Sequence, residues 1–405
     1  MYSKYGALPE AEIMFSKLVH LDTVAWNAML SAYIEMEQGD KALSLYGYMQ
    51  KQGTSPDHLT FVIALQACGI IGEKQQAFQK GETYFLDIGR ALHLDIKRKG
   101  YASHVPIANT LVSMYGKCGS IEEAEDVFNT LGDRDIISWN AMLSACNEQG
   151  QGDKTLWLYR EMQQEQLVLN EITLMCVLQA CSERGNLAIC EKVHFDIVAN
   201  NMGKISPLIS TLINAYGSCA RTADADSVFD ECIDLTFVTW NACIASHVGD
   251  RNSFASLYMF ERSKLTGIMP DSITFTSVLS ACSHNSLVVE GISYFTSMII
   301  DDRERTHFNI MIDLLGRAGD FKKIQSILKR MPMQPDLTVW LCILGACSTH
   351  GNLELAEVAF ENAVRMHPEQ STAYVLMSNI YVDAQLPHSV IDAIKKKSGL
   401  ATFTV

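Results

Sequence analysis

The sequence predicts an all-α solenoid, a stack of short helix pairs that runs along the chain. The first observation is repetition: Trp-Asn-Ala occurs at 26–28, 139–141 and 240–242, and Trp340 follows at the same phase, at intervals of 113, 101 and 100 residues. The second is that apolar residues recur at helical spacing, whereas no stretch alternates with the period of two that strands require. Repetition on this scale is typical of stacked supersecondary units, none of which buries its apolar face alone. Function then resides on an extended surface.

The large repeat divides into three segments. Residues 136–170, 171–205 and 206–236 are 35, 35 and 31 residues long and lead from one Trp-Asn-Ala to the next. The same division gives nine consecutive segments: 23–57, 58–104, 105–135, 136–170, 171–205, 206–236, 237–271, 272–304 and 305–336. The second segment is 12 residues longer than its counterpart 171–205. This insertion near residues 73–84 accounts for the longer first interval.

Each segment predicts two helices joined by a turn. In 105–135 the first helix should end at Cys118-Gly119, because glycine suits the left-handed conformation after a helix. The sequence from Ser120 to Glu123 has the capping-box pattern that begins a second helix. Prolines are few, and Pro56, Pro270 and Pro335 fall at segment boundaries, where no helix needs to continue.

The composition fits a long, packed core. The chain has 405 residues, of which 48% are hydrophobic and 19% charged, so it is not disordered. No apolar run reaches the roughly 18 residues that a membrane helix needs. The twelve cysteines form no Cys-x-x-Cys pair, and five of them follow an alanine at matching places: Cys68, Cys146, Cys181, Cys282 and Cys347. We interpret these five as small core residues rather than metal or redox ligands, in a reducing compartment.

The first residues predict that the sequence begins inside a repeat. Residues 1–6 match residues 114–119, so 1–22 would be the tail of a 31-residue segment whose first helix is mostly missing. Either the chain is a fragment or Met1 is an internal methionine of a longer product. Any targeting peptide would lie upstream, so its absence from these residues decides nothing.

These features resemble the pentatricopeptide repeat (PPR) family, in the subtype that cycles through P, L and S motifs of about 35, 35 and 31 residues. The stretches VAWNAML, IISWNAML and FVTWNACI resemble the openings of P motifs, LVSMYGKCGSIEEAEDVF an S motif and TFTSVLSACSHNSLVVEGISYF an L motif. Residues 337–370 and 371–400 resemble the paired E motifs of organellar RNA-editing factors, the second one degenerate, and 401–405 is a tail. A tetratricopeptide array fits worse, because its period is a constant 34 residues.

The resemblance implies recognition of single-stranded RNA, one base per motif, by the first helices of a right-handed superhelix. The fifth and last residues of a motif would read the base edge. These predicted pairs are Asn27 with Asp57, Asn109 with Asp135, Asn140 with Asn170, Asn241 with Asp271, and Asn309 with Asp336. The family code assigns Asn with Asp to U and Asn with Asn to a pyrimidine. The expected target is therefore U-n-U-Y-n-n-U-n-U, with the final U least constrained.

Some positions depart from the code. Ser210 with Thr236 matches no common pair, and Val62, Met175 and Thr276 at the fifth places of the L motifs should read weakly. The alternative for the asparagines is that they merely accompany the copied tryptophans and bind no ligand.

The second residues Val24, Ile137 and Val238 are the predicted apolar contacts to bases. The tryptophans could instead stack on bases. However, Trp26, Trp139 and Trp240 directly precede the reading asparagines and should point towards the adjoining helix, so we predict that they pack in the core.

No catalytic function is expected. The zinc-deaminase signature, His-x-Glu followed by Pro-Cys-x-x-Cys, is absent from the sequence, and no cofactor is predicted. By resemblance, a role in C-to-U editing would need a deaminase-domain protein or an editing co-factor, docked at residues 337–400. The resemblance also implies a mitochondrial or chloroplast location and no membrane partner.

The charge favours an alternative. The net charge is −14, whereas nucleic-acid binders usually carry a basic surface. Lys97-Arg98-Lys99, Lys322-Lys323 and 395–397 are local basic runs, and each could be an ordinary solvated face. A protein-binding α-solenoid without strong RNA binding is therefore the second hypothesis.

Overall fold

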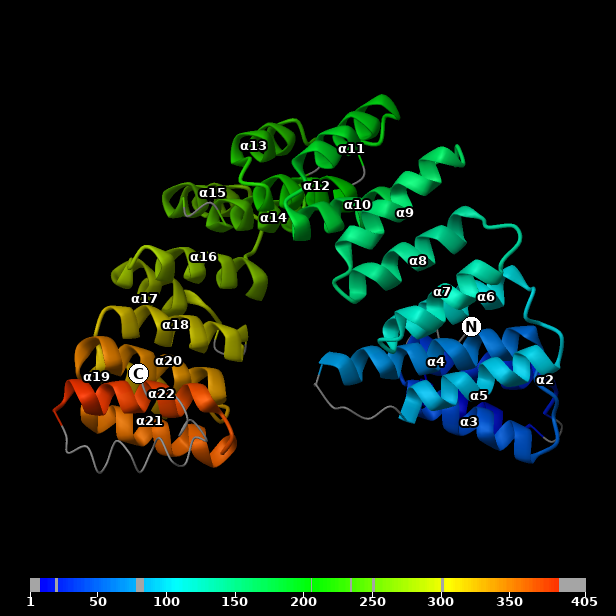
Figure 1. The fold of residues 1–405 in the computed structure, drawn as a ribbon, viewed down its shortest axis with the longest axis horizontal. Coiled ribbons are helices and arrows are strands. Elements are labelled where there is room, and N and C mark those ends of the chain that lie inside the picture. The colour runs from blue at the N-terminus through cyan, green and yellow to red at the C-terminus, as the bar shows by residue number, and fades with distance from the viewer. Residues whose placement is uncertain are drawn as a thin grey trace, which may run out of the picture. The chain divides into compact units, whose positions relative to one another are not determined.

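The computed structural model describes residues 8–18, 21–77, 84–204, 206–233, 235–249, 252–299 and 302–385. These residues form twenty-two helices and no strand (Figure 1), so the predicted all-α solenoid is confirmed. Residues 1–7, residues 78–83 of the predicted insertion and the tail 386–405 lie outside the described residues. Of the predicted second E-like motif, residues 371–400, the structure therefore describes 371–385, and the predicted tail 401–405 lies outside the described residues.

The helices alternate between two sets. The first helices of the segments are α2 (Thr23–Glu35), α4 (His58–Ala77), α6 (Val105–Lys117), α8 (Ile136–Glu148), α10 (Glu171–Arg184), α12 (Ser206–Ser218), α14 (Phe237–Gly249), α16 (Ser272–His284), α18 (Arg305–Arg317), α20 (Leu337–His350) and α22 (Ser371–Asp383). The second helices are α1 (Leu8–Ser16), α3 (Gly39–Lys51), α5 (Tyr84–Arg98), α7 (Ile121–Thr130), α9 (Gly152–Gln164), α11 (Leu187–Ala199), α13 (Thr222–Asp230), α15 (Ser253–Leu265), α17 (Val288–Ser297), α19 (Phe321–Arg330) and α21 (Leu353–Met366). Every first helix begins at the first residue of a sequence segment. The P, L and S classes of these segments stay a prediction.

Local chemistry sets the helix ends. Asp22, Asp135 and Asp336 precede first helices, and each side chain accepts a hydrogen bond from the backbone N–H three residues on. Gly119 has a φ of 81°, which confirms the predicted left-handed turn. The capping box predicted at Ser120 is wrong, because its side chain caps no backbone N–H and instead donates to the Glu123 carboxylate at 2.7 Å.

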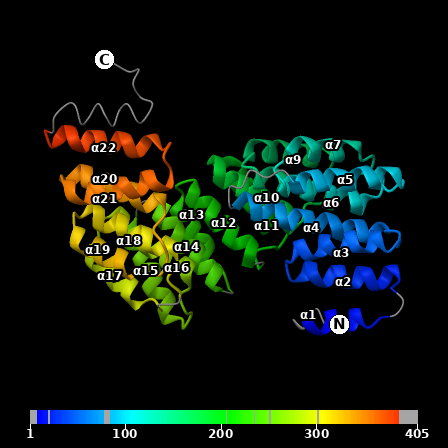
Figure 2. The same cartoon turned by 90° about the horizontal axis from the view of Figure 1, so that it is seen from below.

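The helices belong to two compact units, Met1–Met202 and Gly203–Val405. In the first unit α2 packs against α4, α4 against α6, α6 against α8, and α8 against α10. In the second unit α12, α14, α16, α18, α20 and α22 pack in the same successive manner. Figures 1 and 2 show this succession within each unit. Because each first helix contacts the next one within its unit, a residue at one place in a segment has a counterpart on the neighbouring helix of that unit.

The repeated tryptophans are core residues, as predicted. Trp26, Trp139 and Trp240 are at most 2% exposed. Each meets a phenylalanine of the preceding second helix edge to face, with ring centroids 5.1 Å apart at Phe15, 5.0 Å at Phe128 and 4.7 Å at Phe229. The tryptophans therefore join consecutive segments and are not available for stacking on a base.

Small residues allow the first helices to approach closely. A Cβ added at Gly116 on α6 would lie 2.5 Å from the Cβ of Ala145 on α8, and one at Gly316 on α18 would lie 2.9 Å from that of Ala346 on α20. The five alanine-linked cysteines are all fully buried on first helices, which confirms that they are core residues. At these two places the neighbouring first helices thus approach each other closely.

The insertion lengthens a helix. Helix α4 has 20 residues, against 14 in α10 and 13 in α16, so part of the extra sequence extends its C-terminal end. Residues 78–83 of the predicted insertion lie outside the described residues. At the other end of the unit, α1 supplies Leu8 and Phe15 to the apolar cluster beneath α2.

Candidate nucleic-acid interface

The five predicted reading asparagines occupy the fifth residue of their first helices, α2, α6, α8, α14 and α18. Their predicted partners close the segments and directly precede the next first helix. Stacking of consecutive first helices therefore brings each asparagine towards a residue 26 to 30 positions later. Four of the asparagines are buried, and Asn309 is half-buried.

Four of the five pairs are joined by a hydrogen bond. Asn27 Nδ2 donates to Asp57 Oδ1 at 3.1 Å, and Asn241 Nδ2 donates to Asp271 Oδ1 at 3.0 Å. Asn140 Nδ2 donates to Asn170 Oδ1 at 3.0 Å. The bond from Asn109 Nδ2 to Asp135 Oδ1 is the longest, at 3.4 Å. The structure thus brings together eight of the ten predicted base-reading residues, without testing whether they bind a base.

The last residue of a pair has a second, purely structural role. Asp57 Oδ1, Asn170 Oδ1 and Asp271 Oδ1 accept hydrogen bonds from the backbone N–H of Thr60, Thr173 and Thr274 at 2.8, 3.0 and 2.8 Å. Each is therefore the N-cap of the next first helix. The same oxygen orients the asparagine and begins the neighbouring helix, so its position is fixed from two sides.

These contacts favour the charged form of the aspartates. Burial alone would raise the pKa of Asp57 and Asp271. Hydrogen bonds from the threonine backbone and hydroxyl and from the asparagine amide together outweigh this effect, so the pKa of both carboxyl groups lies below its ordinary value. The pKa of Asp135 is lowered in the same way, by Ser138 and Asn109 against the effect of burial. At neutral pH each of the three pairs presents an amide beside a carboxylate.

The amide keeps unused hydrogen-bonding capacity. A primary amide offers two N–H groups and two carbonyl lone pairs. At Asn241 the Nδ2 atom lies 3.0 and 3.2 Å from the two carboxylate oxygens of Asp271, so one N–H is shared between them, and the carbonyl oxygen accepts from the Thr274 hydroxyl at 2.6 Å. One N–H and one lone pair remain, a donor and an acceptor side by side, which is the complement of a base edge.

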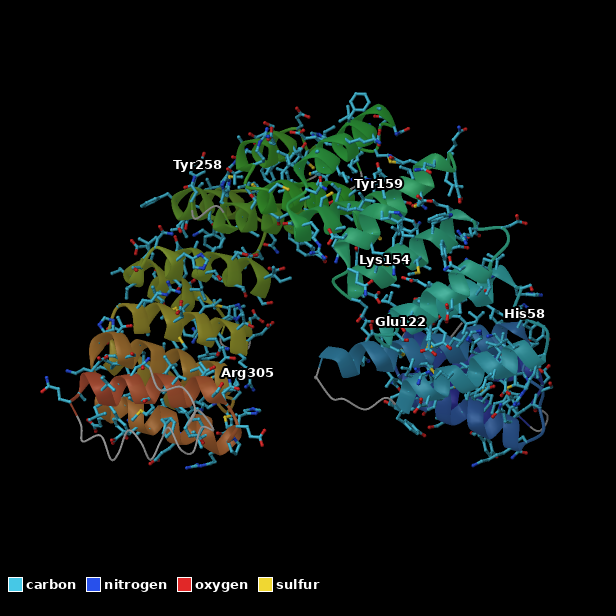
Figure 3. The ribbon with its side chains drawn as sticks, viewed as in Figure 1. His58, Glu122, Lys154, Tyr159, Tyr258 and Arg305 are labelled. Atoms are coloured by element: carbon cyan, nitrogen blue, oxygen red, sulfur yellow. The ribbon has the colours of Figure 1, made fainter. Side chains whose placement is uncertain are left out.

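The Asn309 and Asp336 pair is arranged differently. No hydrogen bond joins these two side chains among the described residues, and Asp336 instead forms an ion pair with Arg305 Nη1 at 3.6 Å. Arg305, labelled in Figure 3, is the first residue of α18. The Asn309 Oδ1 atom is buried without a hydrogen-bond partner in this part of the structure.

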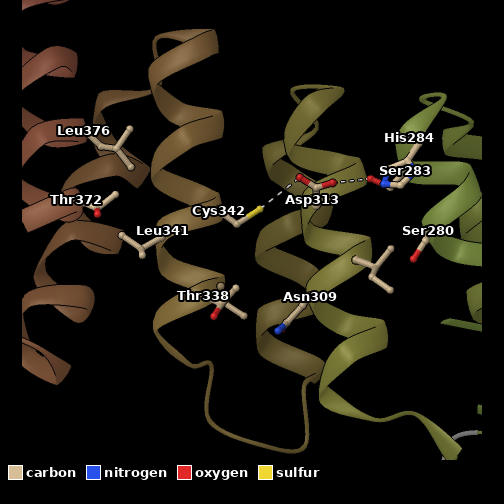
Figure 4. Close-up of a pocket in the computed structure, with 12 residues that line it drawn as sticks. Ser280, Ser283, His284, Asn309, Asp313, Thr338, Leu341, Cys342, Thr372 and Leu376 are labelled. Atoms are coloured by element: carbon tan, nitrogen blue, oxygen red, sulfur yellow. Dashed lines mark hydrogen bonds between the residues drawn. The ribbon is translucent and has the colours of Figure 1, made fainter. Parts of the chain in front are cut away.

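A pocket of about 550 Å³ opens beside Asn309. Figure 4 shows Asn309 and Asp313 on α18 facing it, with Thr338 and Cys342 on the neighbouring α20. Ser283 Oγ donates to Asp313 Oδ2 at 2.6 Å, which fixes that carboxylate on one wall. The hollow runs across four first helices, α16, α18, α20 and α22, and so places an accessible concavity on the face predicted to bind RNA.

The predicted second residues are exposed. Val24, Ile137 and Val238 are 74%, 60% and 43% exposed, in contrast to the buried tryptophans two positions later. The sequence reasoning missed three more members of this row, Leu59, Ile172 and Ile273, which are also exposed at the second places of α4, α10 and α16. Their signal was present in the sequence, since each lies one residue after a segment boundary.

The segment that departs from the code has no amide. Ser210 Oγ donates to the Ser206 carbonyl oxygen at 2.9 Å, while Thr236 Oγ1 lies 3.1 Å from Ser206 Oγ. Thr276, the fifth residue of α16, likewise turns its hydroxyl to the Ser272 carbonyl oxygen at 2.9 Å. These hydroxyls are engaged within the protein, so neither place repeats the asparagine arrangement.

The basic runs are engaged with the protein's own groups. Arg98 pairs with Asp95 at 3.2 Å, Lys99 Nζ donates to Ser55 Oγ at 2.8 Å, and Lys323 pairs with Asp320 at 2.8 Å. Residues 395–397 lie outside the described residues. These three cations are exposed surface groups that already have a partner within the protein.

One side-chain cluster was not foreseen from the sequence. Asp226, Cys243 and His247 place ligand-type atoms within 4.8 Å of one another. The Cys243 thiol and the His247 Nε2 atom both lie within hydrogen-bonding distance of Asp226 Oδ1, at 3.7 and 3.0 Å. Burial raises the pKa of the Cys243 thiol well above its usual range, and the Asp226 charge adds to this. The contacts explain the cluster as a hydrogen-bonded trio between α13 and α14.

In the part of the chain that the structure describes, no helix combines the length and apolarity needed to cross a membrane. Comparison with known sequences gives repeated matches along the chain. The profile described as the PPR repeat family matches residues 21–69, and the profile described as the PPR repeat matches residues 107–136, 137–167, 273–302 and 306–334.

Relatives and solved structures agree with these matches. The chloroplastic pentatricopeptide repeat-containing protein CRR2 of Arabidopsis thaliana is 33% identical over 95% of this chain and 58% of that protein. A mitochondrial pentatricopeptide repeat-containing protein of the same species is 28% identical over 100% of this chain and 71% of that protein. The chain spans about half the length of most of the curated relatives that it matches.

The fold has a counterpart of known structure. The crystal structure of the pentatricopeptide repeat protein PPR10 from maize superimposes with a TM-score of 0.66 at 20% identity, covering 98% of this chain and 63% of that one. PPR10 has also been solved in complex with an 18-nt psaJ RNA element, and that structure superimposes with a TM-score of 0.64 at 20% identity, covering 94% of this chain and 61% of that one. Sequence profiles, relatives and fold together show that the chain belongs to the pentatricopeptide repeat family.

Proposed function

We propose that this chain binds single-stranded RNA in a sequence-specific manner, with one base per segment on the face of the first helices. The observation that carries the proposal is the repeated amide pair. At Asn27, Asn140 and Asn241 a buried amide is held by neighbouring groups and keeps one donor and one acceptor unused. The solved complex of PPR10 with RNA supports this use of the fold.

The last residue of the pair would distinguish the bases. With Asp57 or Asp271, a carboxylate adds acceptors beside the amide, whereas Asn170 has its own amide N–H groups to donate. We propose U opposite the Asn and Asp pairs and either pyrimidine opposite Asn140 with Asn170. The exposed second residues Val24, Ile137 and Val238 would contact the faces of neighbouring bases.

The proposed role is site recognition in organellar RNA processing, specifically for C-to-U editing. Relatives of this chain are named as chloroplastic or mitochondrial proteins, which supports an organellar location. The chain itself would not be the catalyst, and a deaminase-domain protein or editing co-factor would dock on residues 337–400. Helices α20, α21 and α22 are the described part of that surface.

The second candidate function is a protein-binding scaffold. The net charge of −14 and the ion pairs of Arg98 with Asp95 and of Lys323 with Asp320 favour it. The same features predict few phosphate contacts, so RNA affinity should fall only gently with salt.

The test is fluorescence anisotropy with an oligonucleotide of the pattern U-n-U-Y-n-n-U-n-U beside a purine-scrambled control. We expect selective binding that is lost in Asn140→Ala and Asn241→Ala. The matched control is Asn200→Ala, because Asn200 is an exposed asparagine at the end of α11, away from the first helices.

Two results would count against the proposal. Equal, weak binding of both RNAs would favour the scaffold function. Selective binding that both interface variants retain would mean that the asparagines are not the reading residues.

A further inference from the structure

The carbonyl oxygens of the reading asparagines fall into two groups. Those of Asn27, Asn140 and Asn241 accept a hydrogen bond from the hydroxyl of Thr60, Thr173 and Thr274, at 2.7, 2.7 and 2.6 Å. Those of Asn109 and Asn309 are buried and have no partner among the described residues. The donors are not on the asparagine's own segment, since each threonine is the third residue of the next first helix.

The third residue explains the difference. At the two places without a partner it is Ser138 and Val339. The threonine hydroxyls also lie 2.8, 3.0 and 2.8 Å from the N-cap Oδ1 atoms of Asp57, Asn170 and Asp271, so each shares its one hydrogen between the N-cap and the asparagine oxygen. The Ser138 hydroxyl contacts Asp135 Oδ1 at 2.8 Å without reaching the oxygen of Asn109, and Val339 has no hydroxyl to donate. Threonine at the same place is almost entirely buried and reaches the asparagine oxygen in all three cases. The branched Cβ of threonine restricts its χ1 rotamers, whereas serine has no branch at Cβ and is not restricted in this way.

Two opposed contacts fix the orientation of the amide. The threonine hydroxyl holds the carbonyl end, and the aspartate or asparagine N-cap holds the N–H end. Rotation of the Asn241 amide by half a turn would place its oxygen against the Asp271 carboxylate and lose both bonds. For Asn140 the same holds indirectly, because Asn170 is itself fixed by accepting from the Thr173 backbone N–H at 3.0 Å.

We propose that Thr60, Thr173 and Thr274 are positioning residues for base recognition. Each sets the amide orientation of the asparagine one segment earlier, so that the remaining N–H and lone pair always face the base in one order. The segments 58–104, 171–205 and 272–304, whose own fifth residues are poor readers, thus contribute to recognition through a hydroxyl given to their neighbour. This inference rests on the proposed RNA-binding function.

A ranking among the segments follows. Preorganised groups discriminate better, because no conformational freedom is lost when the ligand binds. Discrimination should therefore be strong at Asn27, Asn140 and Asn241. It should be weaker at Asn109, whose amide is held from one end by a 3.4 Å contact, and at Asn309, which is held from neither end.

The experiment measures the ratio of affinities for two RNAs that differ only in having U or A opposite Asn241. Thr274→Val should lower that ratio about fivefold, the size of one ordinary hydrogen bond. The matched control is Thr296→Val, which removes an exposed hydroxyl from α17, away from the first helices. The reverse change, Ser138→Thr, should raise the preference for U opposite Asn109.

A readout in the free protein separates this inference from the proposed function. The side-chain amide signals of Asn241 in an NMR spectrum should shift in Thr274→Val and stay in place in Thr296→Val. If the wild-type protein does not select RNA, the proposed function fails, and these signals alone decide whether threonine positions the amide. An unchanged U-to-A ratio in Thr274→Val together with unchanged preference in Ser138→Thr would overturn the inference, as would unchanged amide signals.

Discussion

Replacement of Asp271 by alanine removes two contacts that meet on one oxygen. Asp271 Oδ1 accepts from the Thr274 backbone N–H at 2.8 Å as the N-cap of α16, and from Asn241 Nδ2 at 3.0 Å. Loss of an N-cap costs about 1 kcal/mol. A buried amide N–H left without its acceptor costs about 1–3 kcal/mol more. The free energy of unfolding should therefore fall by about 2–4 kcal/mol, the sum of these two contributions.

Asp271→Asn provides the internal comparison. Asn170 already performs both roles elsewhere in the chain, as the N-cap of α10 and the acceptor for Asn140. The asparagine variant should therefore lose less than about 1 kcal/mol, since asparagine and aspartate are equivalent caps. It should, however, broaden the preference at that base from U to either pyrimidine, because a donor replaces an acceptor.

The assay is urea denaturation followed by circular dichroism, with anisotropy measurements on the four possible bases. Asp230→Ala is the control, because this exposed aspartate on α13 forms only a surface ion pair with Arg262 at 3.3 Å and should contribute about 0–1 kcal/mol. If Asp271→Ala and Asp271→Asn unfold at the same urea concentration, the double role of this oxygen is refuted.

Three further predictions concern packing, pH and thiol chemistry. Gly116→Ala should lower the free energy of unfolding by about 1–3 kcal/mol, because the added Cβ would lie 2.5 Å from the Cβ of Ala145. The control Gly47→Ala, whose added Cβ would have nothing within 4 Å, should be neutral or slightly stabilising. Equal melting temperatures of the two variants would contradict this prediction. Hydrogen bonds hold the pKa of Asp57, Asp135 and Asp271 below the ordinary 3.8, so the stability that they give is present above about pH 4 and is lost as the pH falls through the folded pKa. The melting temperature should therefore fall on acidification, and it should fall less in the variant with all three aspartates replaced by asparagine. An equal fall in the wild type and the variant would show that these groups do not cause it. Burial raises the pKa of the Cys68 and Cys146 thiols to about 12. Mass spectrometry after treatment with iodoacetamide should therefore find both thiols unmodified in the native protein and alkylated in urea. Rapid alkylation of the native protein would show that they are accessible.

The sequence located the helices because its signals are local. Trp139 marks a first helix, Gly119 marks a helix end, and the apolar spacing between them gives the buried face. The segment boundaries at Thr23, His58 and Val105 are the first residues of helices, since the N-cap residues that precede them differ in chemistry from helix interiors. The one local error, at Ser120, arose because Glu123 competes for the same hydroxyl.

The candidate site was only partly accessible from the sequence. The asparagines and their partners were identified through a family resemblance that pairs residues 26 to 30 positions apart. The sequence did not show that one oxygen of these partners serves both the helix cap and the asparagine, or that threonine completes the arrangement at Asn27 but serine does not at Asn109. The resemblance marked the position of Asn309 as the least constrained, but it did not indicate that Asp336 pairs with Arg305 there.

The sequence by itself therefore determined the all-α class, the periodicity, the helix starts and the burial of the tryptophans, all of which depend on neighbouring residues along the chain. The tertiary structure decided which hydroxyl reaches which amide, where the pocket beside Asn309 opens and which cations are already paired. These depend on side-chain rotamers and on the spacing between stacked helices. Hydrogen bonds form only over a few tenths of an ångström in distance, and that precision arises when consecutive segments pack.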